Sequence, residues 1–113
     1  MTGPPSVAYC RRVMREHARS FYFATRLLPV PKRRAIEALY AFFRCVDDAA
    51  DEGNAAREER RERLHAFRGA VLAMISRSPA GAAEPWFDAL ARAFERYALD
   101  PQPLFELIDG CES

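Results

Sequence analysis

The sequence lacks an excess of charge of either sign. It holds 17 basic and 16 acidic residues among 113, for a formal net charge of +1. A protein with this balance has no overall field that would attract nucleic acid or an acidic membrane. We therefore expect no nucleic-acid partner, and any electrostatic effect must come from local groups of charges.

Cysteine pairs and long apolar runs are also missing. The cysteines, Cys10, Cys45 and Cys111, are odd in number and lack CxxC spacing, which argues against a disulfide framework or a zinc knuckle and predicts reduced thiols. The polar, proline-rich start contains no apolar signal sequence, and no apolar run approaches the ~20 residues of a membrane span. These absences predict a cytoplasmic protein that would contact membranes only at their surface.

Strand-like alternation of apolar and polar residues is absent as well. Half of the residues are hydrophobic, and 113 residues make a single domain at most. Proline and glycine divide the chain into stretches of helical periodicity, which predicts an all-α protein of about five helices. Their expected ranges are Ser6 to about Leu28, Pro31 or Lys32 to before Gly53, Ala56 to Arg77, Pro85 to Ala98, and from the N-cap Asp100 onward.

The last expected helix looks incomplete. An apolar face begins at Leu104, Phe105, Leu107 and Ile108, but the sequence reaches Ser113 without a C-cap. We therefore expect residues 1–113 to be the N-terminal part of one larger domain whose C-terminal remainder is absent.

Three aspartates continue an apolar stripe on the second expected helix. The stripe residues follow one another at helical spacing and are Ile36, Leu39, Tyr40 and Phe43. The same steps lead to Asp47 and then Asp51, two carboxylates one turn apart at positions that the pattern assigns to the interior, with Asp48 at the edge. An ionised carboxylate on an apolar face is costly unless it is paired or holds a metal.

The spacing alone supports two interpretations of these aspartates equally. Magnesium prefers carboxylate and phosphate oxygens, so the aspartates could hold one side of a metal cluster whose other side is a substrate diphosphate. Alternatively, the three aspartates lie on an exposed helix end, where Arg44 and other basic residues pair with them. Aspartates at a helix C-terminus oppose the helix dipole, so the second interpretation has a small cost of its own.

Two segments in this region resemble the opening of squalene/phytoene synthases. The first reads His17-Ala-Arg-Ser-Phe-Tyr-Phe-Ala-Thr-Arg-Leu-Leu-Pro29, and the second reads Ala38-Leu-Tyr-Ala-Phe-Phe-Arg-Cys-Val-Asp-Asp-Ala-Ala-Asp-Glu52. A single DDxxD motif arises by chance in acidic helices, but here both segments occur in order and with the expected short gap. The resemblance is plain from about Cys10 to Gly53 and fainter beyond.

The resemblance implies an isoprenoid synthase-type helical bundle, with a central cavity and an aspartate-rich motif on each of two facing helices. This sequence contains the first motif. The resemblance implies that Asp47 and Asp51 coordinate Mg²⁺, which Mn²⁺ could replace, and that Asp48 supports them. It also implies that Arg44 contacts diphosphate oxygens, since the planar fork of a guanidinium suits phosphate.

Further substrate contacts are implied by the same resemblance. Four residues would line the diphosphate end of the cavity: His17, Ala18, Arg19 and Ser20. Phe21 and Tyr40 would border the reacting carbons, where aromatic faces stabilise carbocations, and Tyr40 would thereby be catalytic together with Asp47 and Asp51. Each has an ordinary alternative, as a core aromatic, a surface histidine or a solvated charge. Four other basic residues are expected at the surface: Arg26, Lys32, Arg33 and Arg34.

The implied reaction joins two prenyl diphosphates, farnesyl or geranylgeranyl, head to head through a cyclopropyl diphosphate intermediate. Metal-bound aspartates would neutralise the leaving diphosphate, and a dry cavity would protect the carbocation from water. Squalene and phytoene are both compatible products, and NADPH would take part only in the squalene-forming branch. The family's second aspartate motif is missing from these 113 residues, so we expect little or no catalysis by this chain alone. The long apolar tails of the substrates favour peripheral membrane contact of the intact enzyme.

Two other functions are alternatives. Trans-prenyl diphosphate synthases and terpene cyclases also use aspartate-rich helices and magnesium, but the Ser20-Phe-Tyr-Phe23 segment ahead of the aspartates argues against them. A small helical interaction module would instead bind a partner helix through the stripe from Ile36 to Phe43. In such a module, replacing Asp47 or Asp51 by alanine would leave binding intact.

Overall fold

The chain folds into a bundle of helices. The computed structural model describes residues 5–50, 57–81 and 83–112. Its elements are α1 (Pro5–His17), α2 (Arg19–Thr25), α3 (Val30–Ala50), α4 (Arg57–Ile75), the short 3-10 helix η1 (Pro79–Gly81), α5 (Phe87–Tyr97) and α6 (Gln102–Glu112). The described residues contain no strand, which confirms the all-α prediction. Among them, no helix has both the length and the apolar character needed to cross a membrane.

The later helices occur where the sequence predicts them, and their ends have local causes. α3 carries Pro31 in its first turn, where a backbone N–H is not needed for the helix. Asp100 caps α6, because its Oδ1 accepts a hydrogen bond of 3.0 Å from the Gln102 N–H. α5 ends at Tyr97, and the next residue, Ala98, has a φ of 49°, the left-handed conformation common at helix C-termini.

The first expected helix breaks at Ala18, so the prediction of one helix from Ser6 to Leu28 is wrong. Ala18 has φ −147° and ψ 63°, outside the helical region. The break lets α2 turn so that Thr25 is buried beside Met14, with Thr25 Oγ1 3.8 Å from Met14 Sδ. In an unbroken helix these two residues would be about 16 Å apart. Packing between α1 and α2 therefore overrides the local preference for a continuous helix.

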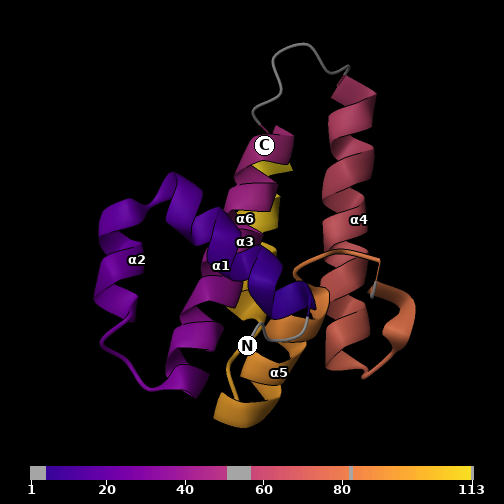
Figure 1. Cartoon of the computed structure of the whole chain (residues 1–113). Coiled ribbons are helices and arrows are strands. Elements are labelled where there is room, and N and C mark those ends of the chain that lie inside the picture. The colour runs from indigo at the N-terminus through magenta and orange to yellow at the C-terminus, as the bar shows by residue number, and fades with distance from the viewer. Residues whose placement is uncertain (1–4, 51–56, 82, 113) are drawn as a thin grey trace.

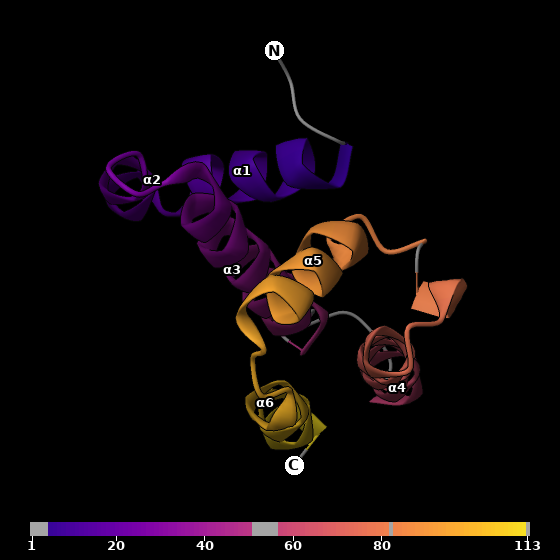
Figure 2. The same cartoon turned by 90° about the horizontal axis from the view of Figure 1, so that it is seen from below.

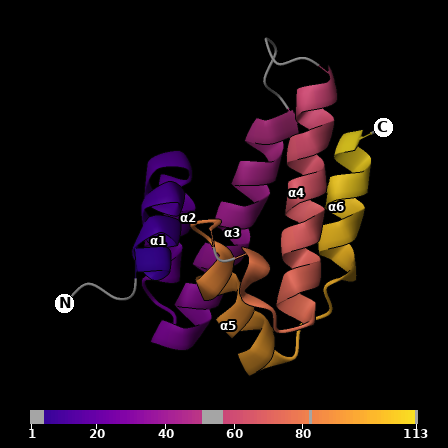
Figure 3. The same ribbon diagram turned by 90° about the vertical axis from the view of Figure 1, so that its right-hand side faces the viewer.

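α3 is the central element of the bundle. α1 and α5 pack against it, while α4 and α6 pack against each other and against α3. α3, α4 and α6 run side by side in Figure 3, and the view from below shows α5 crossing beside α1 and α3 (Figure 2). α2 lies at the periphery, and the C-terminal ends of α3 and α6 reach the same end of the molecule (Figure 1).

An aromatic cluster fills the centre of the bundle. Phe42 from α3, Phe67 from α4 and Trp86 just before α5 are all buried. The Phe42 and Trp86 rings meet edge to face, with centroids 4.9 Å apart and an interplanar angle of 83°. Phe67 stacks on Trp86 at 5.9 Å and 13°. Because the rings come from separate elements, the cluster links α3, α4 and the start of α5.

The three cysteines are free. Burial raises the pKa of the Cys10 thiol to about 12, and it also raises the pKa values of Cys45 and Cys111. All three thiols are therefore protonated and weakly nucleophilic at neutral pH.

Gly81 holds a position where a side chain does not fit. A Cβ there would lie 2.5 Å from Phe87 Cε2 and 3.1 Å from the Ala70 Cα. We expect Gly81→Ala to lower the free energy of unfolding by about 1–3 kcal/mol, because the Phe87 ring and the α4 backbone must both move. Urea denaturation measures the change.

Gly69 in α4 is the matched control, since a Cβ there would meet nothing within 4 Å. Gly69→Ala should raise the free energy of unfolding by about 0.5–1 kcal/mol, because glycine is a weak helix former. A Gly81→Ala variant as stable as the parent would show that this corner of the bundle is loosely packed.

Candidate active site

The C-terminal end of α3 carries two of the predicted aspartates. Asp47 and Asp48 lie in its last turn and are exposed. Arg44, one turn earlier, forms an ion pair with Asp48, with 3.3 Å between Arg44 Nε and Asp48 Oδ1. Such an exposed pair contributes little stability, about 0.3–0.5 kcal/mol, so both side chains are accessible to a ligand. Asp51, the third predicted aspartate, lies outside the described residues.

The stripe that leads to these aspartates is not the buried face of α3, contrary to the prediction. Ile36, Leu39 and Tyr40 are only partly buried, and Phe43 is 42% exposed. The fully buried residues lie on a neighbouring face: Glu37, Ala38, Ala41, Phe42, Val46 and Ala49. Alanines on that face let α1 and α5 approach closely, which larger side chains would prevent. Asp47 therefore follows a half-exposed face, as the interpretation of an exposed helix end expects.

The helix itself aligns the predicted residues of α3. Tyr40, Arg44 and Asp47 or Asp48 follow at steps of four and three residues, so they lie along one side of α3. Tyr40 and Arg44 are partly buried, and the aspartates are exposed. Toward its C-terminal end, this side of α3 therefore presents first an aromatic ring, then a cation and then carboxylates.

The start of the first predicted segment, His17 to Phe21, forms the junction of α1 and α2. His17 ends α1, Ala18 is the break, and Arg19, Ser20 and Phe21 begin α2. Ala18 is partly buried, whereas the other four side chains are exposed, Phe21 by 59%. The end of α1 points toward the same end of the molecule as the C-terminal end of α3 (Figures 1 and 3). In the described structure no hydrogen bond or ion pair joins this segment to Asp47 or Asp48.

The aspartates have the donor chemistry of a magnesium site. Across residues 5–50, 57–81 and 83–112, no three His, Cys, Asp or Glu side chains gather as metal ligands. Asp47 forms no ion pair within those ranges, so its carboxylate is open, and carboxylate oxygens are what magnesium prefers. α6 also approaches this end: burial raises the pKa of Cys111, and the charge of Asp47 raises it further. Asp47 and Asp48 therefore offer carboxylate oxygens of the kind that magnesium prefers, and the described residues bring no third such ligand to them.

A buried carboxylate near the start of α3 was not predicted. Glu37 has no exposed surface and accepts a hydrogen bond from Arg26 Nη2, while Arg11 Nε lies 3.7 Å from the same carboxylate oxygen. Burial raises the pKa of the Glu37 carboxyl, and the guanidinium groups of Arg26, Arg11 and Arg33 oppose that shift without cancelling it. Glu37 therefore links α1, α2 and α3 through charge.

This link corrects the surface assignment of the basic residues around Glu37. Lys32 is exposed as expected, but Arg26, Arg33 and Arg34 are partly buried. Arg33 stands one turn before Glu37 in the sequence, which is the only local sign of pairing. The contacts from Arg11 and Arg26 depend on the break at Ala18, so they follow from the tertiary structure.

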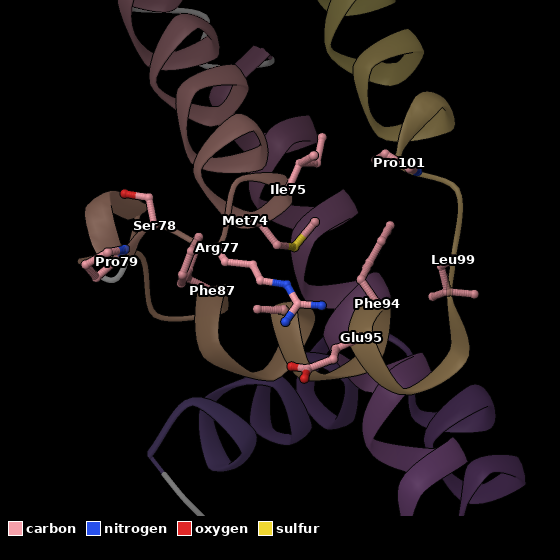
Figure 4. A pocket seen from close by; sticks show the side chains of 11 residues that line it. Met74, Ile75, Arg77, Ser78, Pro79, Phe87, Phe94, Glu95, Leu99 and Pro101 are labelled. Atoms are coloured by element: carbon pink, nitrogen blue, oxygen red, sulfur yellow. The ribbon is translucent and has the colours of Figure 1, made fainter.

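Two hollows lie away from the predicted site residues. The larger, about 480 Å³, is formed by the ends of α4 and α5 and the loop before α6, and Figure 4 shows Met74 and Phe94 pointing into it. The smaller, about 290 Å³, lies between the start of α3 and α5. None of the described residues predicted to bind substrate or metal lines either hollow.

Known proteins are similar in sequence to the part of the chain that contains these residues. The sequence profile of the squalene/phytoene synthases matches residues 14–113. A presqualene diphosphate synthase of Zymomonas mobilis is 36% identical over 91 residues, which cover 80% of this chain and 30% of the relative. A phytoene synthase of Mycobacterium bovis is 39% identical over 98 residues (87% and 30%), and one of Arthrospira platensis is 32% identical over 109 residues (96% and 34%).

The matches include both predicted segments. Residues 14–113 contain the α1–α2 junction, Tyr40, Arg44 and all three aspartates. The chain spans about a third of the length of these relatives. With an all-α bundle and this match over most of its residues, the chain belongs to the squalene/phytoene synthase family.

Proposed function

We propose that this chain supplies the first aspartate helix of a prenyltransferase that joins two prenyl diphosphates head to head. The carrying observation is the family match over residues 14–113, which includes the exposed aspartates at the end of α3. The relatives named phytoene synthase and presqualene diphosphate synthase support this reaction type. The proposed substrates are farnesyl or geranylgeranyl diphosphate, and NADPH takes part only if the product is squalene.

In this proposal the C-terminal end of α3 binds the diphosphate group of the substrate. Asp47 and Asp51 hold magnesium or manganese, and Asp48 lies beside them. When bound, the metal supplies positive charge that offsets the charge of the leaving diphosphate. Arg44 orients Asp48 through their 3.3 Å ion pair, and its other N–H groups can donate to diphosphate oxygens.

In the same proposal the junction of α1 and α2 adds contacts to the diphosphate, and two aromatic residues border the reacting carbons. Arg19, His17 and Ser20 are exposed and offer a cation and hydrogen-bond donors for diphosphate oxygens. Phe21 and Tyr40 offer aromatic faces that stabilise carbocations and exclude water. The apolar tails of such substrates favour a location in the cytoplasm at the membrane surface.

Asp47→Asn tests the proposal through binding. We expect the chain to bind inorganic diphosphate in a magnesium-dependent manner, and the variant to bind it at least about tenfold more weakly, because changes around metal ligands typically cost 10–100-fold. Calorimetric titration with and without magnesium measures the difference.

Asp88→Asn removes an exposed aspartate from α5 and is the matched control. It should bind like the parent. Absence of magnesium-dependent binding in the parent would sink the proposal. The half-exposed stripe around Phe43 would then be better explained as a surface for a partner helix.

A further inference from the structure

We propose that the hollow between the start of α3 and α5 binds a phosphate-bearing anion. This site is separate from the proposed prenyltransferase site. Arg34 in the hollow and Asp47 lie toward opposite ends of α3, about 20 Å apart along the helix. The proposal therefore does not rest on the role of the aspartates.

Charge is the first reason. Three arginines line the hollow, Arg34 from α3 and Arg92 and Arg96 from α5, and none of the described lining residues is acidic. None of the three pairs with a carboxylate of a described residue. Asp88 lies one turn before Arg92 on α5, and these two described residues form no ion pair with each other. Arg92 and Arg96 are exposed like charges one turn apart on α5, so they repel each other, and a bound anion would relieve that repulsion.

Preorganisation is the second reason. Arg34 is partly buried, and its Nε has no hydrogen-bond partner. Arg96 lies over the ring of Tyr97, 5.8 Å from its centroid, which restrains a side chain that would otherwise be free in solvent. The first turn of α3, at Val30 and Pro31, also lines the hollow, and a helix N-terminus carries partial positive charge.

Shape is the third reason. The remaining lining is small and apolar, with Val7 from α1, Ala35 from α3, and Ala89 and Ala93 from α5. Figure 2 shows α5 beside α1 and α3 at this end of the bundle. The volume of about 290 Å³ is near the lower limit of small-molecule sites, which begin at about 300 Å³. A diphosphate, or the phosphate headgroup of a lipid, has the matching charge and size.

The test is calorimetric titration of the chain with inorganic diphosphate in the presence of a chelator, so that magnesium-dependent binding at the aspartates cannot contribute. We expect saturable binding that the double variant Arg92→Gln/Arg96→Gln weakens at least about tenfold, because charge-assisted bonds to phosphate are strong. The double variant Arg57→Gln/Arg61→Gln removes two exposed arginines from α4 and should stay within about twofold of the parent.

Vesicles of phosphatidylcholine with and without phosphatidic acid form the second arm, because a headgroup presents the same phosphate. Binding of free diphosphate that depends on Arg92 and Arg96 assigns a soluble ligand. Binding only to phosphatidic acid vesicles, with the same dependence, assigns a headgroup. Equal losses of binding affinity in the two double variants, or the absence of saturable binding to both diphosphate and vesicles, would overturn the proposal. Asp47→Asn should leave this metal-free binding unchanged, which separates the two proposed sites.

Discussion

Replacing Trp86 by alanine should lower the free energy of unfolding by about 3–5 kcal/mol. Trp86 has no exposed surface, and its ring contacts Phe42 and Phe67, so truncation opens a cavity where three elements meet. Small domains have only about 5–15 kcal/mol of stability in total, so the variant should be close to unfolding. Urea denaturation followed by circular dichroism measures the loss, since the substitution removes the single tryptophan.

Trp86→Phe is the informative comparison. It keeps an aromatic ring against Phe42, and it removes the Trp86 Nε1–H, which is buried without a hydrogen-bond partner. Because an unsatisfied buried donor is costly, the loss of packing is partly offset, and we expect Trp86→Phe to cost less than about half of the alanine value. Equal costs for the two variants would show that the indole ring is not a central packing element.

The sequence predicts the positions of the helices better than the face of each helix that is buried. Local signals predict where α5 and α6 begin: a proline precedes each helix, and Asp100 caps α6. The buried face of α3 does not follow from local signals, because Ala38, Ala41 and Ala49 add little to a hydrophobic pattern yet are fully buried where α1 and α5 pack closely. The hydrophobic periodicity therefore predicts the neighbouring stripe, from Ile36 to Phe43, as the buried face.

The candidate site divides in the same way. Tyr40, Arg44, Asp47 and Asp48 share one helix, so their alignment follows from helical spacing. The position of the His17–Phe21 segment depends on the break at Ala18, and that break depends on the contact of Thr25 with Met14. No local pattern encodes a contact between different helices, so sequence predicts the residue types of the site but not the relative placement of its two halves.

Replacing Arg26 by glutamine should cost about 3 kcal/mol of unfolding free energy at neutral pH, because it removes a hydrogen-bonded counter-charge from a fully buried carboxylate. This expected cost lies at the lower end of the range for broken buried ion pairs, because Arg11 remains near Glu37. Glu37→Gln should change stability by less than about 1 kcal/mol, since Arg11 and Arg26 are 27% and 28% exposed and stay partly hydrated. Urea denaturation compares the two variants.

The pH dependence of stability distinguishes this charge effect from a simple loss of packing. Glu37 has an ordinary pKa of 4.5, which burial raises in the folded chain, so below pH 4.5 its carboxyl is protonated in both states. As pH rises, the unfolded state loses the proton first, and the folded state loses stability until the pH passes the folded pKa. Arg26→Gln raises that pKa further and extends the loss to higher pH, whereas Glu37→Gln abolishes it. Parallel pH profiles for Arg26→Gln and Glu37→Gln would mean that the carboxylate is not the source of the effect.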